Sequence, residues 1–180
     1  RVGFGAIPMQ RLNDDDAIAV IRRCLELGVT YLDTANAYST SEGRIGRALE
    51  GWNGKVVLST KTQSRTAEGV AAHLEQSLRM MKVDAIDLYQ FHNVSTFPDY
   101  EKVLAPGGPY DVVQKAMREG KVKHVGITSH QIDVAKESVK SGRFETIMYP
   151  FNFIVHEPGE ELLALAKQHE VGFIAMKPFA

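Results

Sequence analysis

A repeated alternation of short apolar runs with polar, helix-like stretches constrains this chain more than any other feature. About seven runs have the length of a strand, and most of them are continuously apolar rather than alternating. Continuous runs of this kind are typical of strands that are buried on both faces of a parallel sheet. The expected strands cover residues 2–7, 29–32, 55–60, 85–91, 122–127, 146–148 and 172–175.

The stretches between these runs carry helix signals. Asn13 precedes three acids and opens one helix as a capping residue, and Gly28 ends it in the left-handed conformation that favours glycine. Thr66 caps a later helix. Further helices are expected over residues 41–49, 112–118, 132–141 and 159–168. Residues 93–110 are rich in Pro and Gly and predict a long loop, of the kind that often forms a lid or a binding site.

This strand–helix repetition suits either a (β/α)8 TIM barrel or an open, doubly wound sheet. The first turn, Gly3-Phe4-Gly5-Ala6, lacks the third glycine of a dinucleotide fingerprint, and no helix opens there, which disfavours the doubly wound fold. A barrel usually takes about 250 residues. This chain has 180 residues and no internal linker. We therefore expect a single, incomplete barrel domain over residues 1–180, with about seven strands and with both ends, at Arg1 and Ala180, cut short.

Composition narrows the possible partners. Lys and Arg number 21 against 22 Asp and Glu, and no basic tract is present, so we expect no nucleic acid partner. No apolar run reaches the roughly 18 residues of a membrane helix. The single cysteine, Cys24, allows no internal disulfide and indicates a reducing, cytoplasmic environment. No phosphate loop or zinc-ligand spacing is present, and the oligomeric state stays open.

Four chemically active residues lie where apolar runs give way to polar stretches: Asp33, Tyr38, Lys61 and His92. The active sites of barrels lie at the carboxyl ends of the strands, so we expect these side chains to meet. The Lys61 ammonium would lower the pKa of Tyr38 from its ordinary value of about 10, and Asp33 would hold Lys61 in place. His92 would hydrogen-bond a substrate carbonyl. Tyr38 would protonate that carbonyl as a hydride reaches it, a contribution of roughly 10²–10⁴-fold.

Each of these residues alone also has a purely structural explanation. Asp33 fits a cap or a turn, Tyr38 fits a packed loop aromatic, and His92 fits a satisfied polar residue. Lys61 is harder to explain in this way, because it directly follows a buried strand and needs a partner. The four together therefore indicate a site of proton chemistry.

The motifs around these residues resemble the aldo-keto reductase family over nearly the whole chain. Residues 31–38 are similar to its Asp-Thr-Ala-x-x-Tyr signature, and residues 41–49 to the helix that follows. Residues 58–61 are similar to the strand that carries its lysine, residues 87–92 to the stretch that ends in its catalytic histidine, and residues 120–127 to its next strand. The resemblance implies a TIM barrel, NADP(H) as hydride carrier, a small carbonyl or alcohol substrate, and Tyr38 as general acid with Asp33, Lys61 and His92 as helpers. It also implies cofactor contacts at Gly5, Ala6, Asp33, Ser129 and His130.

The chain departs from the family pattern at three positions. His130 stands where members usually carry asparagine, Met148 where a glutamine ends the sixth strand, and Met176 where an aromatic stacks on the nicotinamide. Residues 175–179 are similar to the branch whose longer members carry a C-terminal ferredoxin-like domain. In the family, the basic residues that bind the 2′-phosphate and adenine of NADP follow an eighth strand, and we expect this chain to lack that strand.

Two other functions remain open from the sequence. The departures at Met148 and Met176 leave room for an NADP(H)-binding, redox-sensing or regulatory module with little turnover. Lys61 on a barrel strand also suits a Schiff-base lyase. A charged lysine is a poor nucleophile, however, and the neighbouring Tyr38 and Asp33 favour the reductase.

Overall fold

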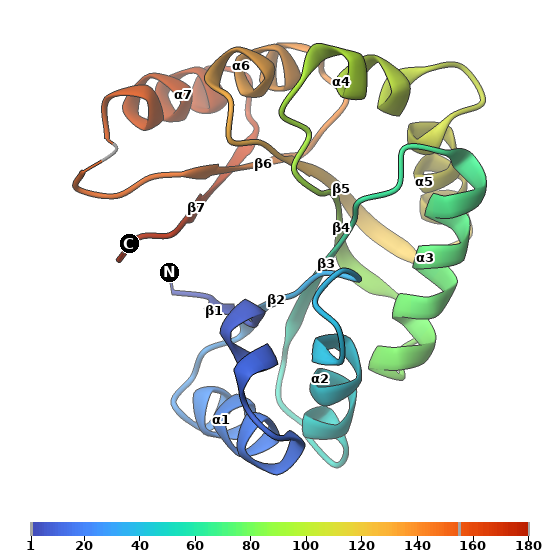
Figure 1. Ribbon diagram of the computed structural model, residues 1–180, viewed down its shortest axis with the longest axis vertical. Helices are drawn as coiled ribbons and strands as arrows, with labels where there is room; N and C mark the ends of the chain where they lie inside the picture. Colours follow the sequence, from blue (N-terminus) through green and yellow to red (C-terminus); the bar gives the residue numbers. More distant parts are fainter. Residues whose placement is uncertain (1, 155, 180) are drawn as a thin grey trace.

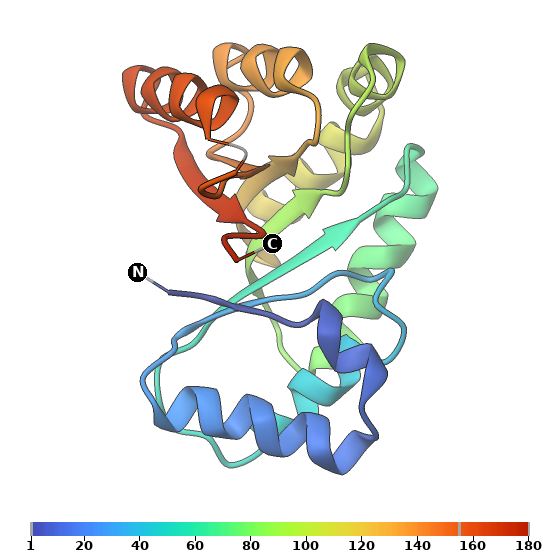
Figure 2. The same cartoon turned by 60° about the vertical axis from the view of Figure 1, so that its left-hand side comes forward.

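Residues 2–154 and 156–179, which the computed structural model describes, contain seven parallel strands that follow one another across a single sheet in sequence order. The sheet curls into most of a barrel, with helices on its outer face (Figure 1). β1 and β7 form its two edges, near the two chain ends (Figure 2). The expected incomplete TIM barrel is confirmed. Arg1 and Ala180, the two ends at which we expected the barrel to be cut short, lie outside the described residues.

The elements alternate as the sequence predicts. The strands are β1 (Phe4–Gly5), β2 (Tyr31–Asp33), β3 (Val57–Thr62), β4 (Ile86–Phe91), β5 (Val122–Thr128), β6 (Thr146–Pro150) and β7 (Gly172–Met176). The helices are the 3-10 helix η1 (Ile7–Arg11), then α1 (Asp14–Glu26), α2 (Ser41–Leu49), α3 (Ala67–Met81), α4 (Phe97–Leu104), α5 (Pro109–Arg118), α6 (Ile132–Lys140) and α7 (Glu157–Gln168).

The helix starts follow the expected capping chemistry. The side chain of Asn13 accepts a hydrogen bond from the backbone N–H of Asp16 at 2.9 Å, and Thr66 accepts one from Gly69 at 3.2 Å. Each bond satisfies a backbone donor that has no partner within the first turn of its helix. Gly28, with φ 84°, turns the chain after α1. The capping residues read from the sequence are therefore confirmed.

The structure corrects two predicted segments. The strand expected over 2–7 shrinks to two residues, because Pro8 cannot donate to a sheet ladder and instead lies in the first turn of η1. The loop expected over 93–110 contains α4 and the first turn of α5. Thr96 caps α4, which buries Tyr100 and Val103 one turn apart. Pro98 and Pro109 lie in the first turns of α4 and α5, where a missing N–H is tolerated, and only Pro106 lies in the turn between them.

Several strands end later than predicted, which changes where the key residues lie. Asp33 and Lys61 are inside β2 and β3 rather than after them, and Met148 is in the middle of β6 rather than at its end. In the ladder, Asp33 pairs with Gly5 on one side and with Ser59 on the other. The polar side chains at this end therefore belong to the sheet itself, which gives them fixed positions.

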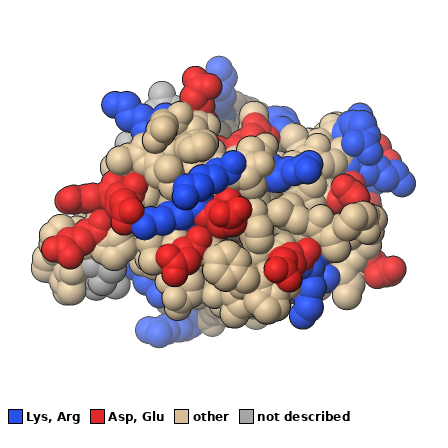
Figure 3. Space-filling view, turned by 90° about the horizontal axis from the view of Figure 1, so that it is seen from above, with Lys and Arg blue, Asp and Glu red and all other residues tan. Residues whose placement is uncertain are grey.

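The outer surface carries both signs of charge. On the face seen in Figure 3, Lys and Arg alternate with Asp and Glu, and no tract of one sign covers it. Within the described ranges, no helix is long and apolar enough to cross a membrane.

Close packing of α2 on α3 yields a stability prediction. A Cβ at Gly46 would lie 2.5 Å from the backbone carbonyl oxygen of Met80, which cannot move easily, whereas a Cβ at Gly43 would meet only the flexible end of the Met80 side chain at 3.0 Å. Alanine favours a helix over glycine by about 1 kcal/mol, but overpacking costs about 1–3 kcal/mol. In urea unfolding, Gly46→Ala should therefore destabilise the protein, while the control Gly43→Ala is neutral or stabilising. Equal effects of the two changes would contradict this packing.

Candidate active site

Four side chains from three consecutive strands and their loops meet at the carboxyl end of the sheet. Asp33 is the last residue of β2, and Tyr38 lies in the loop between β2 and α2. Lys61 lies near the end of β3, and His92 directly follows β4. Contacts join Asp33 to Lys61, Lys61 to the ring of Tyr38, and Tyr38 to His92. The structure therefore brings together all four residues that the sequence singled out.

Asp33 and Lys61 form a buried ion pair. Lys61 Nζ donates to Asp33 Oδ2 at 2.5 Å and to the backbone carbonyl oxygen of Thr34 at 2.6 Å. The Lys61 side chain is only 2% exposed and that of Asp33 14%. A buried charge is tolerated only when it is paired and hydrogen-bonded, so each residue depends on the other. The pair also ties the end of β2 to the end of β3.

Two further polar residues support the carboxylate of Asp33, and sequence reasoning missed both. Ser59 Oγ donates to Asp33 Oδ1 at 2.9 Å. Gln90 Nε2 donates to Ser59 Oγ at 2.8 Å and lies 3.3 Å from Asp33 Oδ1. Both residues are fully buried. The available signal was a polar residue inside an otherwise apolar strand, since such a residue needs a partner.

The hydroxyl of Tyr38 faces the imidazole of His92. Tyr38 Oη lies 3.4 Å from His92 Nε2, and the two rings meet edge to face with centroids 5.5 Å apart. Lys61 Nζ lies over the Tyr38 ring, 5.3 Å from its centroid. The lysine therefore faces the aromatic ring while its hydrogen bonds go to Asp33 and Thr34.

Burial, followed by the negative charge of Asp33, raises the pKa of Tyr38 to about 12. The prediction that Lys61 lowers this pKa is therefore wrong for this geometry. The reason is that the Lys61 ammonium donates its hydrogen bonds to Asp33 and to the Thr34 carbonyl rather than to the phenol, so burial and the charge of Asp33 set the direction. Tyr38 consequently keeps its proton at neutral pH.

His92 is a neutral imidazole at neutral pH. Burial, followed by the charges of Lys61, Arg65 and His130, lowers its pKa to about 4. His92 Nδ1 is buried without a hydrogen-bond partner among the described residues. A buried N–H without a partner is rarer than a buried lone pair, so we assign the ring proton to Nε2, which faces Tyr38.

The expected cofactor residues lie at the same carboxyl end of the sheet, called the mouth below, but they differ in the contacts that they could make with a cofactor. Gly5 pairs with Asp33 in the sheet, and a Cβ added at Gly5 would meet open space. Ala6 is buried, and its N–H donates to the Asp33 carbonyl at 2.8 Å. Ser129 is buried, and its hydroxyl bonds the backbone of Gln131 in a local turn. His130 is exposed at the rim.

The buried ion pair yields a prediction about folding. Asp33→Asn leaves Lys61 charged and unpaired in the interior, and breaking a buried pair in this way costs about 3–5 kcal/mol. Lys61→Met should cost a similar amount, because Asp33 then loses its counter-charge. The double variant leaves no isolated charge, so its loss of unfolding free energy in urea should be well below the sum of the two single losses. Strictly additive losses would show that the residues do not act as a pair.

Known proteins resemble this chain along almost its whole length. It is 28% identical over 193 residues to an uncharacterized oxidoreductase, YqkF, of Bacillus subtilis, covering 99% of this chain and 60% of that protein. Among solved structures, the holo form of the aldo-keto reductase AKR11C1 of Bacillus halodurans superposes with a TM-score of 0.84 at 27% identity, covering 97% of this chain and 60% of that one.

A more distant structure shares the fold. The aldo-keto reductase AKR2E4 of Bombyx mori, solved in complex with NADP, has a TM-score of 0.80 at 19% identity and covers 99% of this chain and 62% of that one. The chain thus spans about 60% of the length of these relatives. The model of the aldo/keto reductase family matches residues 1–180, and the chain therefore belongs to that family.

Proposed function

We propose that this protein transfers a hydride between NADP(H) and a small carbonyl or alcohol substrate, with Tyr38 as the general acid. The convergence of Tyr38 and His92, only 3.4 Å apart, beside the buried Asp33–Lys61 pair carries the proposal. We expect a cytoplasmic location, as the single Cys24 indicates.

The two facing groups can bind one carbonyl oxygen. A protonated Tyr38 donates through its hydroxyl, and a neutral His92 donates through Nε2. Because the two atoms lie 3.4 Å apart, an oxygen to one side of the pair, off the line that joins them, can lie within hydrogen-bond distance of both. His92 orients the oxygen, and Tyr38 supplies the proton as negative charge develops there.

The protonation states suit reduction rather than oxidation. The pKa of Tyr38, raised to about 12, keeps the phenol protonated at neutral pH. Reduction needs that proton on Tyr38 at the start, whereas alcohol oxidation needs Tyr38 to have lost it. Lys61 and Asp33 hold the phenol in place, with the ammonium over its ring. We therefore expect carbonyl reduction to be the favoured direction near pH 7.

Residues at the same mouth fit a bound nicotinamide. The open space at Gly5, directly opposite Asp33 in the ladder, gives a flat ring room beside the carboxyl end of the sheet. Gly5, Ala6, Asp33, Ser129 and His130 are the residues that would hold it. When bound, NADPH supplies the hydride. NADP is present in the structure of the Bombyx mori relative, which supports this choice of cofactor.

A regulatory module that binds NADP(H) with little turnover is the second candidate. Met148 and Met176 replace a glutamine and an aromatic of the family pattern, and this favours a weaker hold on the nicotinamide. A Schiff-base lyase is less well supported. Lys61 is fully buried and donates to both Asp33 and Thr34, which leaves its nitrogen without a free lone pair for attack.

Replacing the proton donor tests the proposal. Tyr38→Phe removes only the hydroxyl, so kcat for a reactive aldehyde with NADPH should fall by about 10²–10⁴-fold. Quenching of protein fluorescence by NADPH should be unchanged, because the ring and the Asp33–Lys61 pair remain. Tyr110→Phe is the matched control, since Tyr110 lies on α5 and its hydroxyl donates to the backbone carbonyl of Arg143 at 2.8 Å rather than to any of the four site residues.

Three outcomes separate the candidate functions. Equal turnover by the protein and Tyr38→Phe would remove Tyr38 from the proton-donor role. Tight NADPH binding with negligible turnover across many carbonyls would favour the regulatory module. Trapping of a substrate on Lys61 by borohydride would favour the lyase.

A further inference from the structure

Arg65 lies at the mouth beside His92, and the proposed proton chemistry does not use it. It belongs to the segment that joins β3 to α3, and its side chain is 16% exposed. Arg65 Nη2 donates to the backbone carbonyl oxygen of His92 at 2.8 Å and to that of Asn93 at 3.2 Å. The guanidinium therefore contacts the backbone that carries one of the four site residues.

The ring of His92 has few polar contacts to hold it. Its Nε2 faces Tyr38, and its Nδ1 is buried without a hydrogen-bond partner in the described part of the chain. The two ring nitrogens of a functional histidine usually divide the work, so that one is anchored by a carbonyl or a carboxylate while the other acts. Because His92 has no such anchor among the described residues, the place of its ring depends on its backbone.

That backbone forms a turn which several segments hold. Asn93 has a φ of 52°, a left-handed conformation that residues other than glycine rarely adopt, and such conformations persist only where the surroundings maintain them. The His92 N–H donates to the carbonyl oxygen of Thr62 at 2.8 Å, and the Asn93 N–H donates to Thr128 Oγ1 at 2.7 Å. Arg65 supplies the donors for both carbonyls of the turn, which completes its hydrogen bonds.

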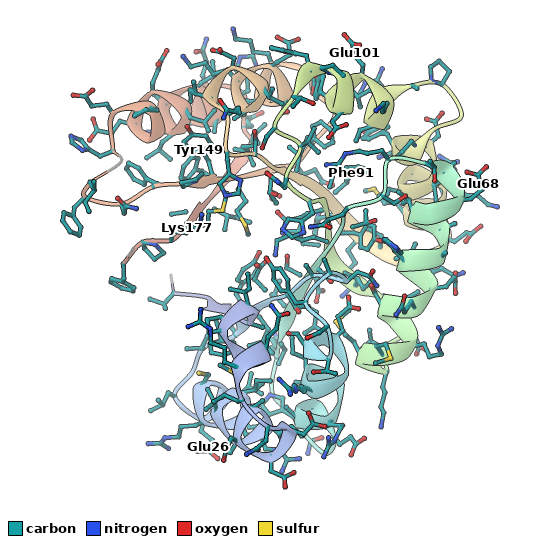
Figure 4. All side chains as sticks on the ribbon, in the orientation of Figure 1. Glu26, Glu68, Phe91, Glu101, Tyr149 and Lys177 are labelled. Carbon is teal, nitrogen blue, oxygen red and sulfur yellow. The ribbon has the colours of Figure 1, made fainter. Side chains whose placement is uncertain are left out.

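Arg65 is itself fixed on two sides. Its Nη1 donates to the backbone carbonyl oxygen of Gln63 at 3.1 Å, and its Nε lies 3.5 Å from Asp99 Oδ2 on α4. In Figure 4, Phe91 labels the end of β4, with Glu101 on α4 above it. A planar guanidinium with N–H donors on three nitrogens can bind these three segments at once, which the single nitrogen of a lysine cannot do.

The charge of Arg65 also acts on His92. Charged or titratable groups from several segments surround the imidazole: Tyr38, Lys61, Arg65, Asp99 through its pair with Arg65, and His130. Burial, followed by the charges of Lys61, Arg65 and His130, lowers the pKa of His92. Arg65 therefore favours the neutral ring that the proposed carbonyl contact uses.

We propose that Arg65 is a positioning residue, whose guanidinium holds the turn of His92 and Asn93 and thereby sets where the His92 ring meets the carbonyl oxygen. The inference rests on the proposed reductase function and goes beyond it by assigning a residue outside the four that converge. Arg65 acts through His92. Within the described ranges, none of its hydrogen bonds goes to a residue proposed to hold the nicotinamide.

Substitution and chemical rescue test the proposal by kinetics. Arg65→Ala removes the donors of both carbonyls, and because a misplacement of about 1 Å can cost about 10²-fold, kcat for a reactive aldehyde with NADPH should fall by about 10- to 10²-fold. Binding of NADPH, followed by fluorescence quenching, should change much less. Ethylguanidinium should restore part of the lost kcat to Arg65→Ala, whereas ethylammonium at the same concentration should not. Arg79→Ala, which removes an exposed arginine on α3, is the matched control and should change none of these values.

Two NMR measurements follow the His92 ring without hydride transfer. The cross-peak between the ring protons of Tyr38 and His92, whose centroids lie 5.5 Å apart, should weaken in Arg65→Ala and in Arg65→Lys but not in Arg79→Ala. The His92 ring should titrate at about 4 in the unaltered protein. Its midpoint should rise in Arg65→Ala, which loses a positive charge, and stay near the original value in Arg65→Lys, which keeps it.

The outcomes separate this proposal from the proposed function. If Tyr38→Phe turns over as fast as the unaltered protein but Arg65→Ala still weakens the cross-peak, the acid role fails and the positioning of His92 stands. If Tyr38 proves essential but Arg65→Ala leaves kcat and the cross-peak unchanged, the reductase stands and the role of Arg65 is refuted. A loss of NADPH affinity as large as the loss of kcat would also overturn the proposal, because it would assign Arg65 to the cofactor site.

Discussion

The buried ion pair between Asp33 and Lys61 is the constraint on which the rest of the mouth depends. Neither charge is tolerated in the interior without the other, and together they tie β2 to β3 at the end where the chemistry is proposed. Ser59 and Gln90 complete the hydrogen bonds of the carboxylate, so the pair is held from three strands. This arrangement provides a rigid base under the more exposed Tyr38 and His92.

The pair also affects the protonation of the groups above it. Lys61 gives its hydrogen bonds to Asp33 and to a backbone carbonyl, so its charge does not act on the phenol as an isolated cation would. Burial then dominates, raising the pKa of Tyr38 and lowering that of His92. Both groups are neutral at neutral pH, one as an acid and the other as a hydrogen-bond donor. This combination suits proton donation to a carbonyl oxygen.

Much of this architecture is predictable from the sequence, because it rests on local rules. Continuous apolar runs predicted the parallel sheet, and the caps Asn13 and Thr66 located the helices they open. Barrel geometry brought Asp33, Tyr38, Lys61 and His92 together from their strand-end positions alone. The carboxyl ends of neighbouring parallel strands lie at one edge of the sheet, which brings those four residues into contact.

Other features depend on three-dimensional packing and could not be read in this way. The helix α4 was not predicted, because the prolines in its segment indicated a loop, although proline is also common in the first turn of a helix. The direction of the Tyr38 pKa shift depends on whether the Lys61 ammonium faces the hydroxyl or Asp33, and sequence does not encode that choice locally. The link between His130 and Lys177 joins segments that are 47 positions apart, across β6. The fold and the meeting of the four side chains were therefore predictable, whereas the protonation of Tyr38 and the contact between His130 and Lys177 were not.

Titration of Tyr38 tests the central claim most directly. The ¹³Cζ NMR signal of Tyr38, assigned by its loss in Tyr38→Phe, reports the protonation of this phenol alone. The account predicts that it does not titrate up to pH 10, because the pKa is raised to about 12 by burial and by Asp33. A titration midpoint below the ordinary tyrosine value of about 10 would contradict the account, because it would mean that Lys61 acts on the phenol rather than on Asp33.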